Sequence, residues 1–290
     1  MISPKYFYDE RGSLLFEEIT TLPEYYPTET ELGIMRDNID DIALLVGTEA
    51  SLIEFGSGSS LKTRVLLEHL DDLAVYVPVD ISEELLLESA EQLREDFTEV
   101  EIMPVTADFT REFALPDPAI MPKRNVVYFP GSTIGNFTHD AALELLQVMH
   151  HEAGEDGALL IGVDLQKDPE VIEAAYNDSA GVTAEFNLNM LRHLNREFDS
   201  DFNLDAWSHD AQYNRDEGRV ELRLISADDQ TVNVGPEVIS VAEGEGLLTE
   251  YSHKYTLEGF AAMAERAGFR VEKVWTDAEQ LFSVQYCVRD

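Results

Sequence analysis

The stretch Glu54-Phe-Gly-Ser-Gly-Ser-Ser60 follows the apolar run Ser51–Phe55 and opens the amphipathic run Ser59–Leu70. A strand, a glycine turn and a helix in this order indicate a nucleotide-type loop, because Gly56 and Gly58 permit a tight turn and a close approach of a ligand. A leucine at position 61 replaces the third glycine of a dinucleotide fingerprint, and no Gly-Lys-Ser/Thr sequence ends the loop. We therefore expect the loop to face an uncharged nucleoside rather than a pyrophosphate; a turn with only a packing role is the alternative.

Apolar runs and amphipathic stretches alternate from this loop to residue 163, which is typical of a parallel sheet covered by helices on both faces. The further strands are expected at Leu73–Val79, Val100–Thr106, Asn125–Phe129 and Ala158–Val163, and the helices at Ser59–Leu70 (with Ser59 or Ser60 as N-cap), Ser82–Asp96 and His139–Ala153. Ligands of such sheets bind at the carboxyl ends of the strands.

The rest of the chain departs from this alternation. After a helix at Leu257–Ala267, the runs Phe269–Trp275 and Leu281–Val288 are joined by a short connection, which predicts an antiparallel pair at the sheet edge. The segment from 168 to 252 is expected to be an insertion with its own small core. Its predicted elements are helices near Glu170–Asn177 and Ala184–Phe198 and strands at Arg219–Ser226 and Val238–Ala242. The first 30 residues are rich in aromatic side chains, so we expect them to pack on the insertion.

Two acids at successive strand ends extend the nucleotide-type site. Asp80 ends the second predicted strand, where a carboxylate can accept both hydroxyls of a ribose, although it could instead cap the next helix. Asp108 follows the third strand and could accept from an exocyclic amine while Phe109 covers a purine face; a helix cap is again the alternative. Together with the loop, these acids indicate the S-adenosylmethionine site of a class I methyltransferase, whose cationic sulfonium suits acidic neighbours.

The net charge of −38, from 58 Asp and Glu against 20 Lys and Arg, excludes several classes of partner. Nucleic acids and anionic membrane surfaces need a basic footprint, so neither is expected. No apolar run reaches 18 residues and residues 1–10 lack a signal-peptide layout, so we expect a soluble cytoplasmic protein. The single Cys287 excludes an internal disulfide, and no histidine has a metal-ligand spacing, so we expect no metal. A solvated acidic surface explains the charge, with adaptation to a salt-rich cytosol as one hypothesis.

Two further stretches could bind a small polar substrate. Pro130-Gly-Ser-Thr-Ile-Gly-Asn136 ends the fourth strand, and its backbone N–H groups and the Asn136 amide could hold a carboxylate. In Gly244–Ser252 the side chains of Glu250 and Ser252 lie on one face if the segment is extended, and could grip an N–H group. An ordinary glycine-rich turn and a solvated strand are the respective alternatives.

Several motifs resemble the ergothioneine-pathway L-histidine Nα-methyltransferases over essentially the whole chain. They are Pro4-Lys-Tyr-Phe-Tyr-Asp9, Leu15-Phe-Glu-Glu-Ile-Thr20, Leu22-Pro-Glu-Tyr-Tyr-Pro-Thr28, Gly131–Asn136, Ala180-Gly-Val-Thr-Ala184 with Phe186-Asn187, and Leu248-Thr-Glu-Tyr-Ser252. The resemblance implies an α/β class I (Rossmann-like) methyltransferase domain at 30–166 and 255–290. It also implies a smaller α+β substrate-binding domain at 1–29 and 167–254.

The resemblance also implies the residues of the site. S-adenosylmethionine contacts would fall on Gly56, Ser57, Lys62, Asp80, Asp108 and Phe109. The carboxylate of histidine would be held by Asn136 and Tyr176, and its imidazole by Glu250 and Ser252. Phe16, Tyr25 and Thr133 would line the region of the amine and ring, with Tyr8 as the catalytic residue that positions the amine. This chain has Leu222 where the family often has methionine near the imidazole.

The predicted reaction is in-line methyl transfer from S-adenosylmethionine to the α-amine of L-histidine, in up to three rounds, giving the betaine hercynine. Neither a metal nor a covalent enzyme intermediate is needed, because catalysis comes mostly from alignment of the reacting atoms. The only partner expected is the amino-acid substrate, and the protein is expected to be a monomer. The alternatives are the same reaction on another amino acid such as tryptophan, and a catalytically silent amino-acid-binding protein of the same fold. A dehydrogenase would require NAD binding and is disfavoured by the leucine at position 61.

Overall fold

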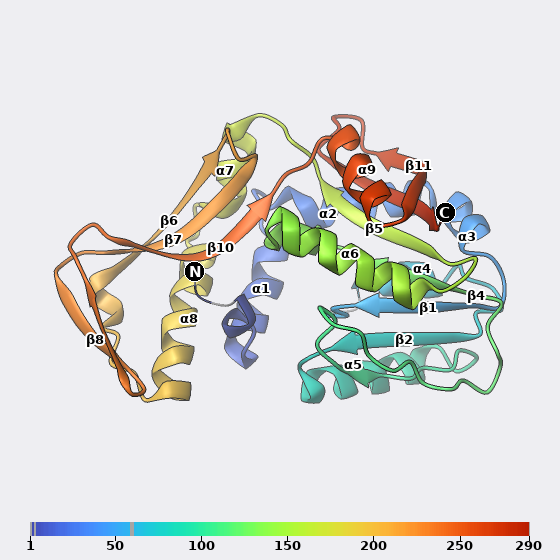
Figure 1. Cartoon of the computed structure of the whole chain (residues 1–290), viewed down its shortest axis with the longest axis horizontal. Coiled ribbons are helices and arrows are strands. Elements are labelled where there is room, and N and C mark those ends of the chain that lie inside the picture. Colours follow the sequence, from blue (N-terminus) through green and yellow to red (C-terminus); the bar gives the residue numbers. More distant parts are fainter. Residues whose placement is uncertain (1, 3, 59–60, 290) are drawn as a thin grey trace. The chain divides into compact units, whose positions relative to one another are not determined.

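The strands predicted around the glycine loop form a seven-stranded sheet of order β11-β12-β5-β4-β1-β2-β3 in the computed structural model, which describes residues 2, 4–58 and 61–289 (Figure 1). β1 to β5 are parallel, whereas β12 runs antiparallel to both β5 and β11. The predicted antiparallel pair at the sheet edge is thereby confirmed. The strands are β1 (Ala50–Phe55), β2 (Val75–Asp80), β3 (Val105–Thr106), β4 (Arg124–Phe129), β5 (Ala158–Asp164), β11 (Phe269–Thr276) and β12 (Phe282–Arg289).

Helices cover both faces of this sheet because its strands are apolar on both sides. The helices are α2 (Tyr26–Asp37), α3 (Ile39–Val46), α4 (Leu61–Leu67), α5 (Glu83–Asp96), α6 (His139–Ala153) and α9 (Leu257–Arg266). In β1, Leu52 belongs to the core cluster beneath α2, α3, α4 and α5, whereas its neighbour Ile53 belongs to the cluster beneath α6 and α9. The alternation of side chains along a strand thus supplies both cores from the same residues.

The third predicted strand is shorter than expected. The sequence predicts a strand over Val100–Thr106, but the ladder contains only β3 and an isolated bridge between Tyr76 and Ile102. Pro104 lies between these two pairings, and proline has no N–H to donate to a ladder. The predicted N-cap of α4, Ser59 or Ser60, lies outside the described residues.

Contacts divide the chain into two units: unit 2 comprises Glu29–Leu165 and Tyr255–Asp290, and unit 1 comprises Met1–Thr28 and Gln166–Lys254. Unit 1 contains a three-stranded sheet of order β10-β7-β6 and a separate hairpin of β8 and β9. Its elements are η1 (Pro4–Phe7), α1 (Glu10–Thr20), α7 (Pro169–Tyr176), α8 (Val182–Phe198), η3 (Leu204–Ala206), β6 (Trp207–Asn214), β7 (Arg219–Ser226), β8 (Gln230–Val234), β9 (Glu237–Val241) and β10 (Gly246–His253).

The aromatic N-terminal segment packs on the insertion, as its composition predicts. Phe7 is fully buried and its ring stacks on that of Phe186 in α8, with 4.6 Å between the ring centroids. Ile19 of α1 belongs to the same core cluster as Leu191 of α8. The helical form of this segment is not among the sequence predictions.

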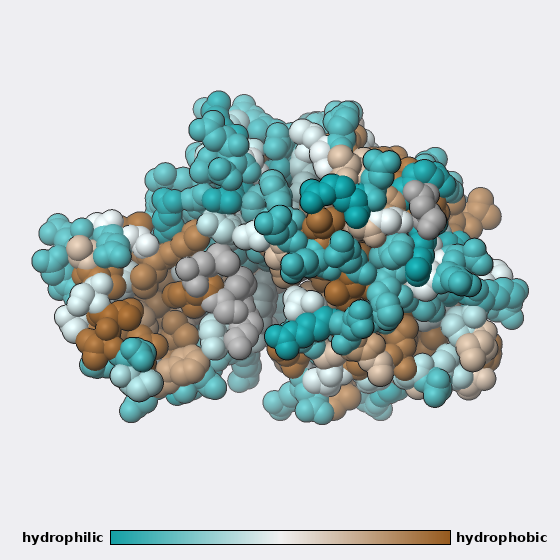
Figure 2. Space-filling view, in the orientation of Figure 1, coloured by the Kyte–Doolittle hydropathy of each residue, from teal (hydrophilic) through white to brown (hydrophobic). Residues whose placement is uncertain are grey.

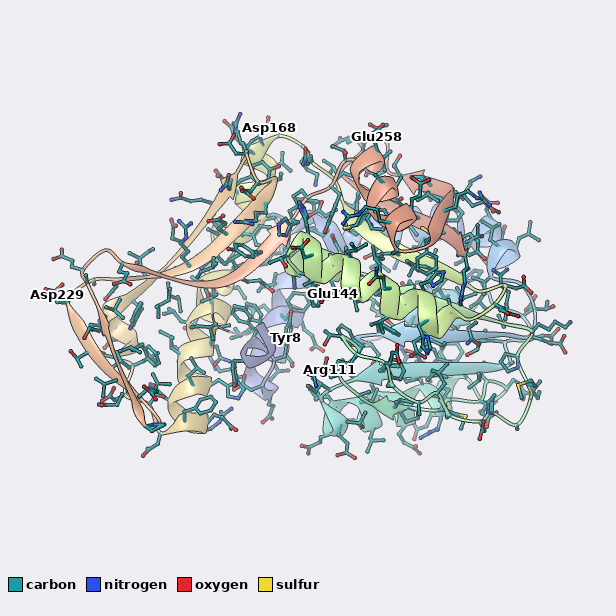
Figure 3. All side chains as sticks on the ribbon, in the orientation of Figure 1. Tyr8, Arg111, Glu144, Asp168, Asp229 and Glu258 are labelled. Atoms are coloured by element: carbon teal, nitrogen blue, oxygen red, sulfur yellow. The ribbon has the colours of Figure 1, made fainter. Side chains whose placement is uncertain are left out.

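Charged side chains cover the exterior of both units. In Figure 2 hydrophilic residues occupy most of the visible face, and Figure 3 shows acids on several elements, among them Glu144 on α6, Glu258 on α9 and Asp229 before β8. All three side chains belong to exposed residues. Within the described part of the chain, no helix is both long and apolar enough to cross a membrane.

A buried ion pair inside unit 2 connects three segments that are distant in sequence. Glu31 of α2 is 1% exposed, and its Oε2 lies 2.5 Å from Nζ of Lys62 in α4. The backbone N–H of Gly131 donates to both Glu31 carboxylate oxygens, with N–O distances of 2.9 and 3.1 Å. Gly162 in β5 makes room for this group, because a Cβ there would lie 2.1 Å from Glu31 Oε1.

We predict that Gly162→Ala lowers the free energy of unfolding by about 1–3 kcal/mol, since the added methyl group overpacks a held carboxylate. Gly33→Ala is the matched control: no heavy atom lies within 4 Å of a Cβ at this helical position, and alanine should stabilise α2 by roughly 0.5–1 kcal/mol. Denaturant unfolding measures both. The cost of Gly162→Ala should shrink in a Glu31→Ala background; an undiminished cost would show that Glu31 is not its cause.

Candidate active site

The glycine loop lies directly after β1, as predicted, and adopts conformations that favour glycine. Gly56 has φ +73° and Gly58 has φ +43°, both in the left-handed region. A Cβ on Gly56 would lie 3.5 Å from the Phe109 ring. A Cβ on Gly58 would have the Gly56 carbonyl oxygen as its nearest neighbour, at 3.9 Å. Ser57 is buried between the two glycines. The loop therefore offers an open backbone position next to an aromatic ring, which fits a nucleoside.

Glu54, the acid that begins the loop motif, is a structural residue that the sequence prediction did not assign. Its carboxylate is buried, and Oε2 accepts hydrogen bonds of 2.5 Å from Thr63 Oγ1 in α4 and Tyr76 Oη in β2. Burial raises the pKa of Glu54 to about 7, against the two hydrogen bonds, which lower it. Glu54 thus fixes α4, and with it Lys62, to the sheet.

Asp80 and Asp108 each bond to the backbone of the turn that follows them. Asp80 ends β2, and its Oδ1 accepts from Ser82 N at 2.9 Å; burial raises the pKa of its carboxyl group. Asp108 is exposed two residues after β3, where Oδ1 accepts from N and Oγ1 of Thr110 at 3.1 and 2.6 Å. These contacts resemble the cap alternative. Arg111 Nε lies 3.8 Å from Asp108 Oδ2.

The Pro130–Asn136 loop is held rigidly at the end of β4. Besides the Gly131 bond to Glu31, Ser132 Oγ accepts from Asp164 N at 2.9 Å, and Thr133 Oγ1 donates to Pro130 O at 3.2 Å. Ser132 has φ +55°, a strained value for a residue other than glycine. The 3-10 helix η2 (Thr133–Asn136) places Asn136 half-buried at its end. Lys62 also faces this loop, since a Cβ on Gly131 would lie 3.3 Å from its Nζ.

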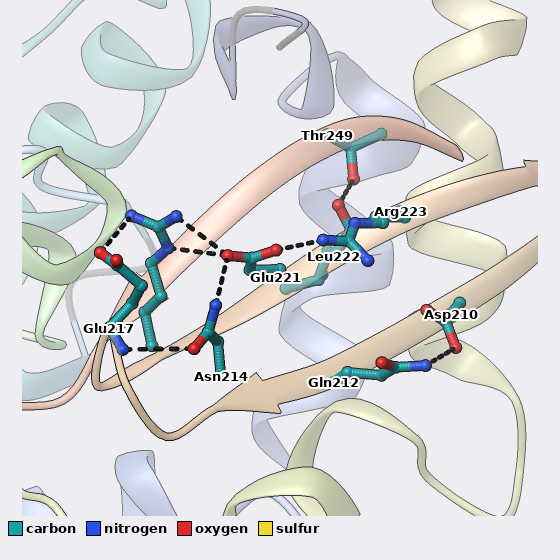
Figure 4. A network of polar contacts seen from close by, with 9 residues as sticks. Asp210, Gln212, Asn214, Glu217, Glu221, Leu222, Arg223 and Thr249 are labelled. Atoms are coloured by element: carbon teal, nitrogen blue, oxygen red, sulfur yellow. Dashed lines mark hydrogen bonds and ion pairs between the residues drawn. The ribbon is translucent and has the colours of Figure 1, made fainter. Parts of the chain in front are cut away.

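In unit 1, a β-bulge determines which face of the small sheet carries Glu250. Leu248 pairs with Arg223, but Glu250 pairs with Leu222, so Thr249 is an extra residue in β10. Without the bulge Glu250 would lie opposite Glu221, on the other face. Thr249 is fully buried, and its Oγ1 donates to Leu222 O at 3.0 Å (Figure 4). The bulge therefore brings Glu250, Leu222 and Ser252 onto one face.

The opposite face of this sheet carries a network of charges. Glu221 accepts from Arg219 Nε and Nη2 at 3.0 and 2.9 Å, from Asn214 at 3.3 Å, and also from Arg223 (Figure 4). The Arg219 guanidinium carbon lies 3.9 Å from the centroid of the Tyr251 ring. Glu221 and Glu250, on opposite faces, thus have contrasting surroundings.

Glu250 is a buried acid whose Oε1 has no hydrogen-bond partner among the described residues. Burial raises its pKa to about 8, although the positive charge of Lys254 acts in the opposite direction. An acceptor left unpaired in this way costs stability, and a ligand N–H would remove that cost. The arrangement is therefore suited to binding a donor.

Ser252 belongs to a hydrogen-bonded triangle with Tyr176 and Lys254. Tyr176 Oη and Ser252 Oγ are 2.7 Å apart, and Lys254 Nζ donates to each of them at 2.8 Å. All three residues are buried. Sequence reasoning missed Lys254, although it lies two residues beyond Ser252 and is one of only six lysines.

The predicted aromatic residues form a connected row in unit 1. Tyr8 meets Phe16 edge to face at 5.8 Å between centroids, Phe16 meets Tyr25 at 6.3 Å, and Tyr25 meets Tyr176 at 6.4 Å. Tyr8 is 37% exposed, so one side of its ring is accessible. The row leads from an accessible tyrosine to the triangle. No group of three or more potential metal ligands occurs among the residues described.

Comparisons with known proteins find relatives over almost the whole length of this chain. Residues 1–289 match the model of a family described as histidine-specific methyltransferase, SAM-dependent. A histidine N-alpha-methyltransferase of Mycolicibacterium smegmatis is 40% identical over 99% of this chain and 90% of its own length. The histidine N-alpha-methyltransferase of Mycobacterium tuberculosis is 38% identical over 95% of this chain and 86% of its own length. Ergothioneine biosynthesis protein 1 of Neurospora crassa is 32% identical over 93% of this chain and 31% of its own length.

Solved structures share the fold at low identity. An S-adenosylmethionine-dependent methyltransferase from Clostridium acetobutylicum has a TM-score of 0.51 at 9% identity, covering 89% of this chain and 91% of its own. The 1,6-didemethyltoxoflavin-N1-methyltransferase of Burkholderia thailandensis also has a TM-score of 0.51, at 11% identity, and the match covers 100% of this chain and 91% of that one. The predicted class I methyltransferase fold is thus confirmed.

We predict that the two buried acids make the protein less stable as pH rises. The folded chain keeps protons on Glu54 up to about pH 7 and on Glu250 up to about pH 8, whereas an unfolded glutamate loses its proton near 4.5. Between these values the folded state binds more protons, so each acid lowers the free energy of unfolding by up to about 1.4 kcal/mol per pH unit. Urea unfolding from pH 5 to 8 should give a flatter profile for Glu54→Gln and for Glu250→Gln. The exposed Glu237→Gln is the control, and parallel profiles for all variants would contradict the prediction.

Proposed function

This chain belongs to the SAM-dependent, histidine-specific methyltransferase family, and we propose that it methylates the α-amine of L-histidine up to the trimethyl betaine hercynine, in ergothioneine biosynthesis. The 40% identity to a histidine N-alpha-methyltransferase over almost the full length of both chains supports the activity. Glu250 is the observation that supports the substrate, since its buried, unpartnered oxygen suits an imidazole N–H.

We assign cofactor binding to unit 2. Gly56, Ser57 and the Phe109 ring form a cradle that fits a nucleoside; Asp80 would accept from the ribose and Asp108 from the adenine amine. S-adenosylmethionine supplies an electrophilic methyl group on a cationic sulfur. Lys62 faces the same end of the sheet and is held there by Glu31, and its remaining ammonium protons would donate to the carboxylate of S-adenosylmethionine.

We assign recognition of the amino acid to unit 1, together with Asn136 and Thr133 of the Pro130–Asn136 loop. Tyr176 and Asn136 would hold the carboxylate, Glu250 and Ser252 the ring, and Phe16, Tyr25 and Leu222 the apolar surroundings. Tyr8 would position the amine, whose lone pair must be free of its proton before attack. Rate acceleration then follows from holding nitrogen in line with the reacting carbon.

Incubation with isotopically labelled S-adenosylmethionine and each of the twenty amino acids, followed by mass analysis, tests this proposal. Mono-, di- and trimethyl products from histidine are expected. A product from tryptophan or another amino acid alone would replace histidine as the substrate. Histidine binding without any methyl product would identify a silent binding protein instead.

We predict that Glu250→Ala raises the KM for histidine about tenfold, because leaving the buried ring without its hydrogen-bond partner costs roughly 1–3 kcal/mol. The KM for S-adenosylmethionine should stay within about twofold, a change of under roughly 0.5 kcal/mol. Steady-state kinetics measures both values. Glu237→Ala, at an exposed acid of the same unit, is the control. Equal losses for the two substrates would contradict the role of Glu250 at the ring.

We also propose that the acidic surface is an adaptation to a salt-rich cytosol. Screening shortens the range of repulsion between like charges to about 3 Å at 1 M salt. The melting temperature should therefore rise between dilute buffer and molar KCl, and equally in choline chloride of the same ionic strength. An unchanged melting temperature in both salts would contradict the adaptation hypothesis. The cytoplasmic location and the monomeric state stay predictions from the sequence.

A further inference from the structure

Lys254 is a buried cation that the assigned roles leave unused. It is 3% exposed and follows β10 immediately. Its backbone is held on both sides, since its N–H donates to Gly218 O at 2.8 Å and its carbonyl oxygen accepts from Gln166 Nε2 at 3.2 Å. Gly218 has φ +64°, and a Cβ there would lie 2.6 Å from that Gln166 nitrogen, so this corner leaves no space for a larger residue. The position of the Lys254 side chain is thus set by its surroundings.

The hydrogen-bond inventory of the triangle limits what its hydroxyl groups can do. A lysine ammonium only donates, whereas each hydroxyl carries one proton and also accepts. Lys254 donates to both hydroxyls, and these are themselves 2.7 Å apart. One hydroxyl proton must therefore lie between the two oxygens. Only the other hydroxyl proton is left to point at a ligand.

We propose that Lys254 is a positioning residue for the histidine site, which directs the Tyr176 and Ser252 hydroxyls so that the pair donates one hydrogen bond to the substrate and accepts another. This inference rests on the proposed function, in which Tyr176 faces the substrate carboxylate and Ser252 the ring. A carboxylate only accepts, so Tyr176 uses its proton there. Ser252 then donates to Tyr176 and keeps one lone pair for the ring.

The consequence is a ring subsite with two acceptors, Ser252 Oγ and Glu250 Oε1. An imidazolium ring satisfies both with its two N–H groups. A neutral imidazole satisfies them when Glu250 keeps its proton, because the ring then donates to Ser252 and accepts from Glu250; the raised pKa of Glu250 is in keeping with this arrangement. An indole has a single N–H and leaves one acceptor unpaired, at a cost. Lys254 thereby favours histidine over tryptophan without contacting the ring.

A mutant cycle in the full-length protein tests the proposal. Tyr176→Phe, Ser252→Ala and the double variant are made with Lys254 present and again with Lys254→Met, and KM for histidine, KM for S-adenosylmethionine and kcat are measured. With Lys254 present the two single effects on histidine KM should be strongly non-additive, because each deletion releases the other hydroxyl. With Lys254→Met this coupling should weaken, because the two hydroxyls can then donate to each other in either order and neither lone pair is taken by the ammonium. Lys254→Met alone should raise histidine KM about tenfold, the usual size for a lost charge-assisted hydrogen bond, with little change in the KM for S-adenosylmethionine.

Lys167→Met is the matched control, since Lys167 Nζ also donates to a tyrosine hydroxyl of unit 1, that of Tyr26, at 2.6 Å. It should leave the coupling between Tyr176 and Ser252 intact. Additive effects of Tyr176→Phe and Ser252→Ala with Lys254 present would overturn the proposal, even if Lys254→Met failed to fold. A coupling of unchanged size in folded Lys254→Met would overturn it too. An unmodified protein that fails to methylate histidine would overturn the proposed function first, and this inference with it.

Discussion

The pairing of Glu31 with Lys62 is the interaction on which the structure of unit 2 depends. Removing two opposite charges from water is costly, so a buried pair persists only where further hydrogen bonds complete it. Here the completing donor is the backbone of Gly131, at the start of the Pro130–Asn136 loop. The ion pair thus fixes α2, α4 and the Pro130–Asn136 loop at once. Glu54 is a second buried acid of unit 2 that is held by hydrogen bonds, with Thr63 and Tyr76 as its donors.

Unit 1 uses buried charge for a different purpose. Lys254 donates to the hydroxyl groups of Tyr176 and Ser252, and Oε1 of Glu250 has no hydrogen-bond partner in the part of the chain that the structure describes. On the reverse face of the same sheet, Glu221 has arginine and asparagine donors to neutralise it. The contrast separates an acid whose charge is paired within the sheet from one with an unpaired, buried oxygen. In a chain with 58 acids, this difference in surroundings, and not the number of acids, is what supports the proposed role of Glu250.

The sequence predicts the large sheet well because its physical signal is local. Parallel strands buried on both faces are continuous apolar runs, and α6, which covers them, has the predicted bounds. In the small sheet of unit 1, β7 also has the predicted bounds. β6 is a different case: Trp207–Asn214 is mostly polar and buries only Trp207 and Ala211, so it lacks such a run. The N-terminal helices depend on packing against α8, which no local pattern reveals. Similarly, residue types at 250 and 252 indicate a donor-binding pair, but the contact of Ser252 with Tyr176 and Lys254 depends on segments almost 80 residues apart.

The bulge at Thr249 makes the register of β10 as important as its composition. If the strand paired regularly through Thr249, that residue would lie opposite Leu222, and the two faces would be exchanged from there to the end of the strand. Glu250 would then lie opposite Glu221, on the face of the arginines, and Tyr251 would lie on the face that Glu250 now occupies. A chain with this register could retain every side chain with a proposed role and still lose the face that Glu250, Leu222 and Ser252 share. Any redesign of this strand must therefore preserve the bulge as well as the residue types.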